Sequence, residues 1–361
     1  MSEQTVGVFG GYILGGGHSP LSSILGMGAD HVLSFSVVLP SGEFVIASPT
    51  SNPDLFFALR GGGGSTFGIV TSLIVKAYPD IPVTTTAFSF SPSATVSVDS
   101  FWAGLRAYFN YLIPHSDAGI YTYFWGFPGP TAFFQPVFAP NLTIAQTKAL
   151  LDPFIADLAK LNITVTPAYT YHPNFLSAWT ARFPQEGAGG FQLLGSRLFP
   201  RSSWLNKTSL DATFAEWRKS IEVGHLTINF NFAPRYAGPE KDTTAVLHAW
   251  RETVMHSIQT VGLTGNETET QLRAARALMD ERQKAWQAVS PDAGSYLGES
   301  DREEVGFQQS FYGRNYERLL KIKRELDPWD VLWAKTAVGS DRWEVKTGDV
   351  IEDENGPLCR V

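Results

Sequence analysis

Cysteine is almost missing from this sequence, since its 361 residues include a single one, Cys359. One thiol excludes an intrachain disulfide, a cysteine-based zinc cluster and a thiolate relay. Basic residues are also scarce: 28 Lys and Arg stand against 35 Asp and Glu, and the formal net charge is −7. A nucleic-acid-binding face needs concentrated positive charge to displace counterions. We therefore expect no nucleic-acid partner.

Long apolar runs are absent as well. No stretch approaches the roughly 18 residues that cross a bilayer, so no membrane partner is expected. The first four residues have neither the basic region nor the apolar region of a signal peptide, which as written predicts a cytoplasmic chain. N-x-S/T sequons favour a secreted ancestry instead, and they lie at Asn141, Asn162, Asn206 and Asn266. The two indications conflict, and the location stays open.

Glycine is plentiful in two clusters, Gly15–Gly17 and Gly61–Gly64, each beside apolar, strand-like sequence. Glycine runs cost conformational entropy and are used where a backbone must pass close to another group. Together the clusters predict a backbone-lined slot for a flat or phosphate-bearing ligand. The second cluster lacks the Lys-Ser/Thr pair of a P-loop, and the sequence has no G-x-S-x-G motif and no Rossmann fingerprint.

Aromatic residues are also abundant, at 13% of the chain. Such side chains fill thick cores and line pockets for planar ligands. We expect five of them, on two predicted strands, to wall a pocket for an apolar or aromatic small molecule: Tyr121, Phe124, Trp125, Phe127 and Phe134.

Hydrophobic periodicity predicts the order of the elements. The first part reads as a β-hairpin at 32–38 with 43–47, then a short helix at 55–59 that begins after a proline, and then a strand at 67–78. The Pro-, Ser- and Thr-rich passage 79–97 is the expected domain boundary. Helices are then predicted at 100–113, 143–161, 204–221, 245–261, 269–289 and 301–326. Strands are predicted at 120–127, 132–138, 163–169 and 226–232, the last with its apolar face buried and its polar face in water.

Three separated motifs resemble a known family. Residues 5–21 with Gly28-Ala29-Asp30 are similar to the second half of the flavin-binding domain of the vanillyl-alcohol-oxidase superfamily. Gly61–Gly64 with Phe67-Gly68-Ile69-Val70 resembles the second signature of that domain. The run 311–319, with Asp327-Pro328 after it, resembles the berberine-bridge-enzyme-like segment of fungal members. The resemblance extends from one end of the chain to the other.

This resemblance implies an α+β fold with a partial PCMH-type FAD-binding domain, an antiparallel-sheet substrate domain covered by helices, and a berberine-bridge-like segment. The expected boundaries are 1–80 for the second half of the FAD-binding domain, 81–295 for the substrate domain and 296–361 for the C-terminal segment that returns to the flavin.

The resemblance also implies FAD as cofactor. The positions that would touch it are Tyr12, Gly15, Gly16, Gly17, His18, Ser19, Gly63, Gly64, Phe67, Gly68, Ile69, Val70, Asn315 and Tyr316. Backbone amides of the first glycine cluster suit a diphosphate. Asn315 would bind the polar edge of the flavin ring, and Tyr316 would pack near it.

The activity implied is oxidation of an alcohol or of a C–H or C–N centre in a small secondary metabolite, with hydride passing to the flavin and O₂ as acceptor. Tyr312 and Tyr296 are the candidate acid/base groups, although each could equally be a core aromatic. His225 could contact substrate. Neither His225 nor His248 has a second ligand at metal-binding spacing, so no metal site is expected.

Two departures from the family pattern affect this expectation. Family members carry a further flavin-binding lobe upstream, which often provides a histidine bonded to the flavin, and many provide a cysteine near the position of Glu3. We therefore expect FAD to be held without a covalent bond, and the chain to be a shortened product. The alternative is a catalytically silent remnant that acts at most as a small-molecule-binding protein.

Overall fold

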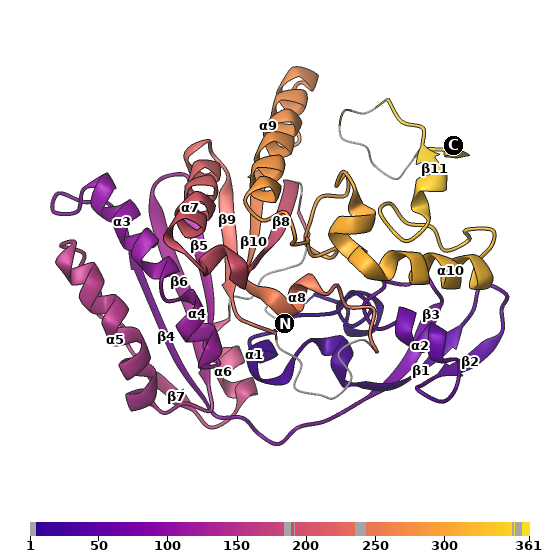
Figure 1. Ribbon diagram of the computed structural model, residues 1–361, viewed down its shortest axis with the longest axis horizontal. Helices are drawn as coiled ribbons and strands as arrows, with labels where there is room; N and C mark the ends of the chain where they lie inside the picture. The colour runs from indigo at the N-terminus through magenta and orange to yellow at the C-terminus, as the bar shows by residue number, and fades with distance from the viewer. Residues whose placement is uncertain (1–4, 184–188, 191, 235–242, 349, 351–355) are drawn as a thin grey trace.

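A computed structural model describes residues 5–183, 189–190, 192–234, 243–348, 350 and 356–361. Glu3, where the family pattern would place a cysteine, lies outside them. Two β-sheets of different size sit at opposite ends of an elongated molecule (Figure 1). The mixture of helices with antiparallel sheets confirms the α+β class.

The smaller sheet has three antiparallel strands in the order β2-β1-β3. They are β1 (Val32–Val38), β2 (Phe44–Ala47) and β3 (Ile69–Val75). The predicted hairpin is confirmed, with Phe35 opposite Ala47 and Val38 opposite Phe44. The predicted short helix is α2 (Pro53–Ala58), which begins at its proline because the ring fixes a helical φ where no backbone donor is needed.

The larger sheet has seven antiparallel strands in the order β7-β4-β6-β5-β9-β10-β8. Their bounds are β4 (Val83–Phe90), β5 (Tyr121–Phe127), β6 (Thr131–Pro140), β7 (Thr170–His172), β8 (Gln192–Pro200), β9 (Leu226–Asn231) and β10 (Thr253–Gly262). Strand β4 lies within the passage 79–97 that was predicted to be the domain boundary. Val83 and the three threonines that follow are buried, and β4 pairs with β6 and β7.

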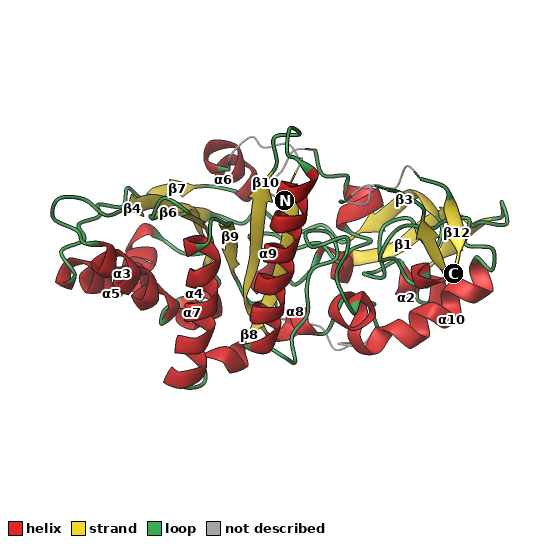
Figure 2. Cartoon of the chain, turned by 90° about the horizontal axis from the view of Figure 1, so that it is seen from above, coloured by secondary structure: helices red, strands yellow, loops and turns green. Residues whose placement is uncertain are grey.

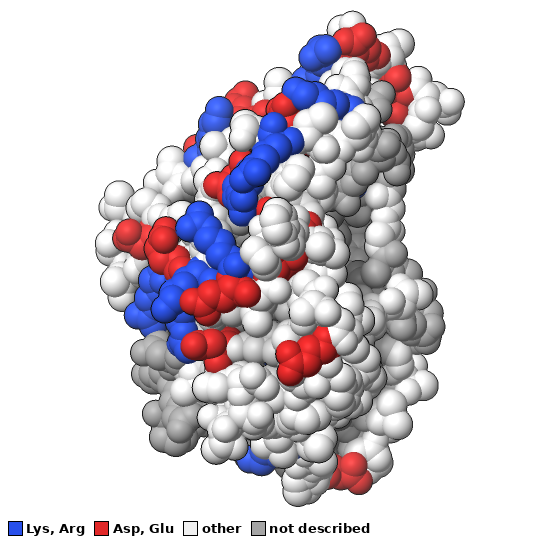
Figure 3. All heavy atoms as spheres, turned by 90° about the vertical axis from the view of Figure 1, so that its right-hand side faces the viewer, with Lys and Arg blue, Asp and Glu red and all other residues white. Residues whose placement is uncertain are grey.

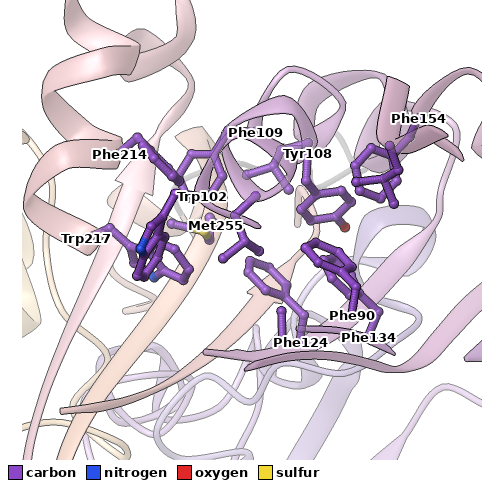
Figure 4. Close-up of a cluster of buried hydrophobic side chains, with 14 of the residues drawn as sticks. Phe90, Trp102, Tyr108, Phe109, Phe124, Phe134, Phe154, Phe214, Trp217 and Met255 are labelled. Atoms are coloured by element: carbon purple, nitrogen blue, oxygen red, sulfur yellow. The ribbon is translucent and has the colours of Figure 1, made fainter. Parts of the chain in front are cut away.

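Helices cover one face of this sheet (Figure 2). They are α3 (Val98–Phe109), α4 (Leu112–Asp117), α5 (Ile144–Lys160), α7 (Lys207–Glu222) and α9 (Glu269–Ala288). The core between helices and sheet is strongly aromatic, with Tyr108, Phe124, Phe134 and Phe154 in mutual ring contact (Figure 4). Helix α6 (Phe175–Arg182) lies on the other face.

This core corrects the expected pocket wall. Phe124 and Phe134 are fully buried against the helices, so neither can touch a ligand. Because side chains alternate along a strand, the opposite face of β5 carries Tyr121, Tyr123 and Trp125. Sequence alone could not tell which of the two faces the helices would cover.

Strand β9 inverts the expected polarity. The alternation itself was predicted correctly, but the polar face is not in water: Thr227, Asn229 and Asn231 are fully buried under the helices. Asn229 accepts from Trp217 Nε1 at 2.8 Å and from Ser257 Oγ at 2.6 Å, and it donates to the Phe124 carbonyl at 3.1 Å. These bonds replace the water that the amide loses on folding.

Three other predictions of secondary structure were wrong. Residues 245–261 form the short helix α8 (Ala249–Glu252) followed by β10, because β10 pairs with β8 and β9 on both sides. Residues 163–169 are irregular, and β7 follows them. The predicted helix 301–326 is helical in its last part, where α10 (Tyr316–Leu326) follows the tight turns Gln308–Tyr312 and Gly313–Asn315.

The remaining elements are short. They are a π-helical turn η1 (Val8–Tyr12), α1 (Ser22–Leu25), the 3-10 turns at Gly28–His31, Arg201–Trp204 and Ser340–Arg342, and the pair β11 (Trp343–Val345) with β12 (Leu358–Arg360). The side of the molecule that carries the three-stranded sheet, α10 and β11 is mixed in character (Figure 3), with charged side chains in a band and a broad uncharged area beside it. Among the described helices, none is long and apolar enough to cross a bilayer.

The inverted strand gives a stability prediction. We expect Asn229→Ala to lower the free energy of unfolding by at least about 3 kcal/mol, because two buried donors lose their acceptor. The apolar neighbour Ile228 is only partly buried, so Ile228→Ala should cost about 1 kcal/mol. Urea unfolding of both variants measures the difference. A larger loss for Ile228→Ala would contradict the buried polar face.

A buried histidine predicts acid sensitivity. Burial lowers the pKa of His115 to about 4, against 6.5 for an exposed imidazole. Below pH 6.5 the unfolded chain takes up this proton and the folded chain does not, so stability falls as the pH drops towards 4. From pH 7 to pH 5, His115 should cost about 2 kcal/mol. Urea unfolding at both pH values should show a smaller loss for His115→Gln than for the unaltered chain; equal losses would refute the assignment.

Candidate functional site at the junction of the two sheets

A cavity of about 590 Å³ lies where the two parts of the chain meet. This volume is within the range of small-molecule and cofactor sites. One wall is the face of the large sheet opposite α3, α4, α5, α7 and α9, with Tyr123, Leu194, Ile228, Phe230 and Ile258. The apolar side chains of β9 therefore face a cavity, and its polar side chains lie in the core under the helices.

A second wall is made of main chain before the first glycine cluster and of the second cluster. The Gly63 N–H donates to the Leu14 carbonyl at 2.9 Å, so the second cluster lies beside the residue that precedes the first. Gly11, Tyr12 and Gly64 line the cavity on this side.

The glycines of this wall have two different surroundings. A Cβ added to Gly10 or Gly11 would meet no atom within 4 Å, so their backbone faces open space. A Cβ on Gly61 would lie 2.4 Å from the Val246 nitrogen, and one on Gly64 would lie 2.6 Å from the Gly10 carbonyl oxygen. The first pair leaves room for a flat ligand, and the second pair lets the chain pack against itself.

Three side chains from distant parts of the chain meet at the cavity. Glu299 Oε2 accepts from His256 Nε2 at 2.8 Å and lies 3.1 Å from His18 Nε2. His18 stacks on Phe232 and Trp250. His256 is fully buried, whereas one third of the Glu299 side chain is exposed, on the cavity side.

The two histidines determine the charge of this group. Burial pushes the pKa of Glu299 upward, but the charge and hydrogen bond of His18 and the hydrogen bond of His256 hold it well below its usual range. Burial lowers the pKa of His256, against the pull of the carboxylate. Near neutral pH the cavity therefore holds an ionised carboxylate beside a neutral buried imidazole.

Of the two candidate acid/base tyrosines, the structure brings only Tyr296 to the cavity. Burial and the charge of Glu299 raise the pKa of Tyr296 well above 10, so its hydroxyl stays protonated and can donate a hydrogen bond. Tyr312 lies in the hydrophobic core of the smaller lobe, which is the part of the molecule around the three-stranded sheet. Its hydroxyl donates to the Thr336 carbonyl at 2.9 Å. Burial raises the pKa of Tyr312 too.

The expected flavin contacts are distributed unevenly. Four of the predicted site residues line the cavity: Tyr12, His18, Gly64 and Tyr296. Gly15, Gly16 and Gly17 are buried just behind it, and the Tyr12 ring packs on Gly17. Burial raises the pKa of Tyr12 to about 12. Ser19 shapes the following turn, where its N–H donates to Ser22 Oγ.

The other predicted contacts lie away from the cavity. Asn315 Nδ2 donates to the carbonyls of Ala245 and Val246, at 3.2 and 3.3 Å. Through this bond the C-terminal segment holds the loop against which Gly61 packs. The remaining positions lie in the core and on β3 of the smaller lobe, and they are Gly63, Phe67, Gly68, Ile69, Val70 and Tyr316. His225 is fully buried, with Nδ1 3.1 Å from Gln259 Oε1, and does not line the cavity.

Sequence reasoning missed Glu299 and His256. His256 was assigned to a helix, in which its direction could not be related to β9. Glu299 lies in the acidic run 299–304, beside the predicted Tyr296, and that run was a usable signal.

Comparisons with known proteins agree with this architecture. The family described as "Berberine and berberine like" matches residues 295–339, which contain Tyr296, Glu299 and Asn315. The FAD-linked oxidoreductase patO of Aspergillus clavatus is 36% identical over 376 residues, covering 99% of this chain and 61% of that protein. The VAO-type flavoprotein oxidase VAO615 of Thermothelomyces thermophilus is 32% identical, again covering 99% and 61%.

Solved structures show the same relationship. The VAO-type flavoprotein MtVAO615 of Myceliophthora thermophila C1 superimposes with a TM-score of 0.88 at 30% identity, over 99% of this chain and 64% of that one. The chain thus spans about three fifths of the length of the curated relatives it matches. In its fold, its C-terminal segment and its sequence, the chain is similar to berberine-bridge-enzyme-like members of the vanillyl-alcohol-oxidase-type flavoproteins.

Proposed function

We propose that this chain forms the substrate-facing part of an FAD-linked oxidoreductase that acts on an alcohol, or on a C–H or C–N centre, of a small apolar molecule. The observation that carries the proposal is the cavity, with open glycine backbone on one wall and an apolar sheet face on the other. The relatives named as FAD-linked oxidoreductases support it.

The residues of the cavity would bind and orient the substrate. Leu194, Ile228 and Ile258 offer an apolar surface that excludes water, and the protonated Tyr296 offers a hydrogen-bond donor. Bound FAD would supply a hydride acceptor, and O₂ would reoxidise it. Gly11 and Gly64 would hold the flavin ring against the cavity.

We propose that FAD is bound without a covalent link. The only cysteine, Cys359, lies on β12, outside the cavity lining, and His18 is engaged by Glu299. Acid precipitation of the flavin-loaded protein should leave all flavin in the supernatant. Flavin that stays in the pellet would contradict this proposal.

A glycine substitution tests the flavin wall. A side chain at Gly11 has room in the flavin-free protein but would fill the cavity. Gly11→Leu should therefore leave the melting temperature unchanged and weaken FAD binding at least tenfold, as measured by quenching of flavin fluorescence. Gly129→Leu is the matched control, since it too meets no atom within 4 Å but lies outside the cavity lining. Equal FAD affinity in both variants would show that the flavin does not bind against this wall.

The second candidate function is binding without catalysis, favoured by the same apolar cavity. Desalting after incubation with FAD separates the two. Yellow protein whose flavin is bleached anaerobically by alcohols of the substrate class supports the oxidoreductase. Colourless protein whose tryptophan fluorescence still responds to apolar ligands supports a binding protein.

A further inference from the structure

We propose that His18, His256 and Glu299 form a binding site for a divalent transition-metal cation of the Zn²⁺ type, open to the cavity. Two imidazoles and one carboxylate are a donor set that Zn²⁺ uses where it keeps a free coordination position. The sequence predicted no metal site from the surroundings of His225 and His248, and it is the fold that brings His18, His256 and Glu299 together.

The distances between the donor atoms are close to those that a metal requires. Bonds of about 2.0–2.1 Å in a tetrahedral site put neighbouring ligand atoms about 3.3 Å apart. Here His18 Nε2 lies 3.3 and 3.1 Å from the two Glu299 oxygens, and His256 Nε2 lies 2.8 Å from Oε2. All three donor atoms lie within 4.8 Å of one another. Small side-chain rotations would therefore create the site.

The surroundings of the carboxylate favour a cation. His18 packs against the rings of Phe232 and Trp250, and His256 packs against Phe230. An anion among aromatic rings has a high electrostatic energy unless positive charge lies close to it. A bound divalent cation would supply that charge directly, in place of hydrogen bonds.

The surroundings limit the expected affinity. In the described structure, Nδ1 of His18 and Nδ1 of His256 are buried without a hydrogen-bond partner. Metal-binding histidines normally donate their second ring N–H to an acceptor, and losing that support costs 10- to 100-fold in affinity. We therefore expect a dissociation constant of about micromolar size.

The accessible side of the site faces the cavity. Glu299 and His18 belong to its lining, whereas His256 is fully covered. The nearby Arg276 is paired with Asp280 and Asp301, which reduces its repulsion of a cation. Water or a ligand hydroxyl could complete the coordination, and a metal there would polarise that oxygen.

Titration of the flavin-free protein with Co²⁺ tests the proposal, because tetrahedral Co²⁺ gives visible ligand-field absorption. We expect one saturable site that Zn²⁺ displaces. Glu299→Gln keeps the shape of the side chain but removes its charge, and it should weaken binding at least about 100-fold. His256→Gln should do the same. Circular dichroism checks that each variant is folded.

The matched control is His248→Gln, since His248 lies outside the cluster and contacts Arg314. It should bind Co²⁺ as the unaltered chain does. Octahedral, weak absorption in the unaltered chain, or equal affinity in Glu299→Gln and His248→Gln, would overturn the proposal and leave a hydrogen-bonded cluster only. Because no flavin is present, this outcome is independent of whether the chain binds FAD.

Discussion

The rest of the site depends on one interaction, in which Glu299 accepts hydrogen bonds from two histidines that are distant from it in the sequence. It joins the segment after the first glycine cluster, strand β10 of the large sheet and the C-terminal segment at one point. A buried carboxylate without such partners would be neutralised or would destabilise the fold. The group therefore links these three segments at the cavity and places a carboxylate in its lining, where Arg276, Asp301, Arg302 and Glu303 also lie.

The two faces of the large sheet have different roles: one packs against the helices in the core, and the other lines the apolar cavity. Aromatic side chains on the helix-covered face form the core (Figure 4). The polar side chains of β9 are placed in that core, where Asn229 satisfies Trp217 and Ser257. This arrangement leaves Ile228 and Phe230 for the cavity. A strand with the usual polarity would have put amides where an apolar ligand is expected to bind.

Close contact between main chains is the second constraint. Gly61 lies against the backbone of Val246, and Asn315 holds the same loop through two carbonyls. Gly61 thus meets the loop at Val246 with no side chain between them, and the side chain of Asn315 fixes the same loop from the C-terminal segment. Gly10 and Gly11 are different because nothing lies over them, and their open backbone is what makes this wall a candidate flavin surface.

The sequence by itself determined the α+β class, the first hairpin and the family resemblance, because these depend on periodicity, turn residues and contiguous motifs. It could not determine which face of β5 or β9 the helices would cover, since alternation is symmetrical until the layers pack. Nor could it bring His18, His256 and Glu299 together, because their proximity arises from sheet pairing and from the return of the C-terminal segment. Only the tertiary structure decided where the charge of the cavity lies.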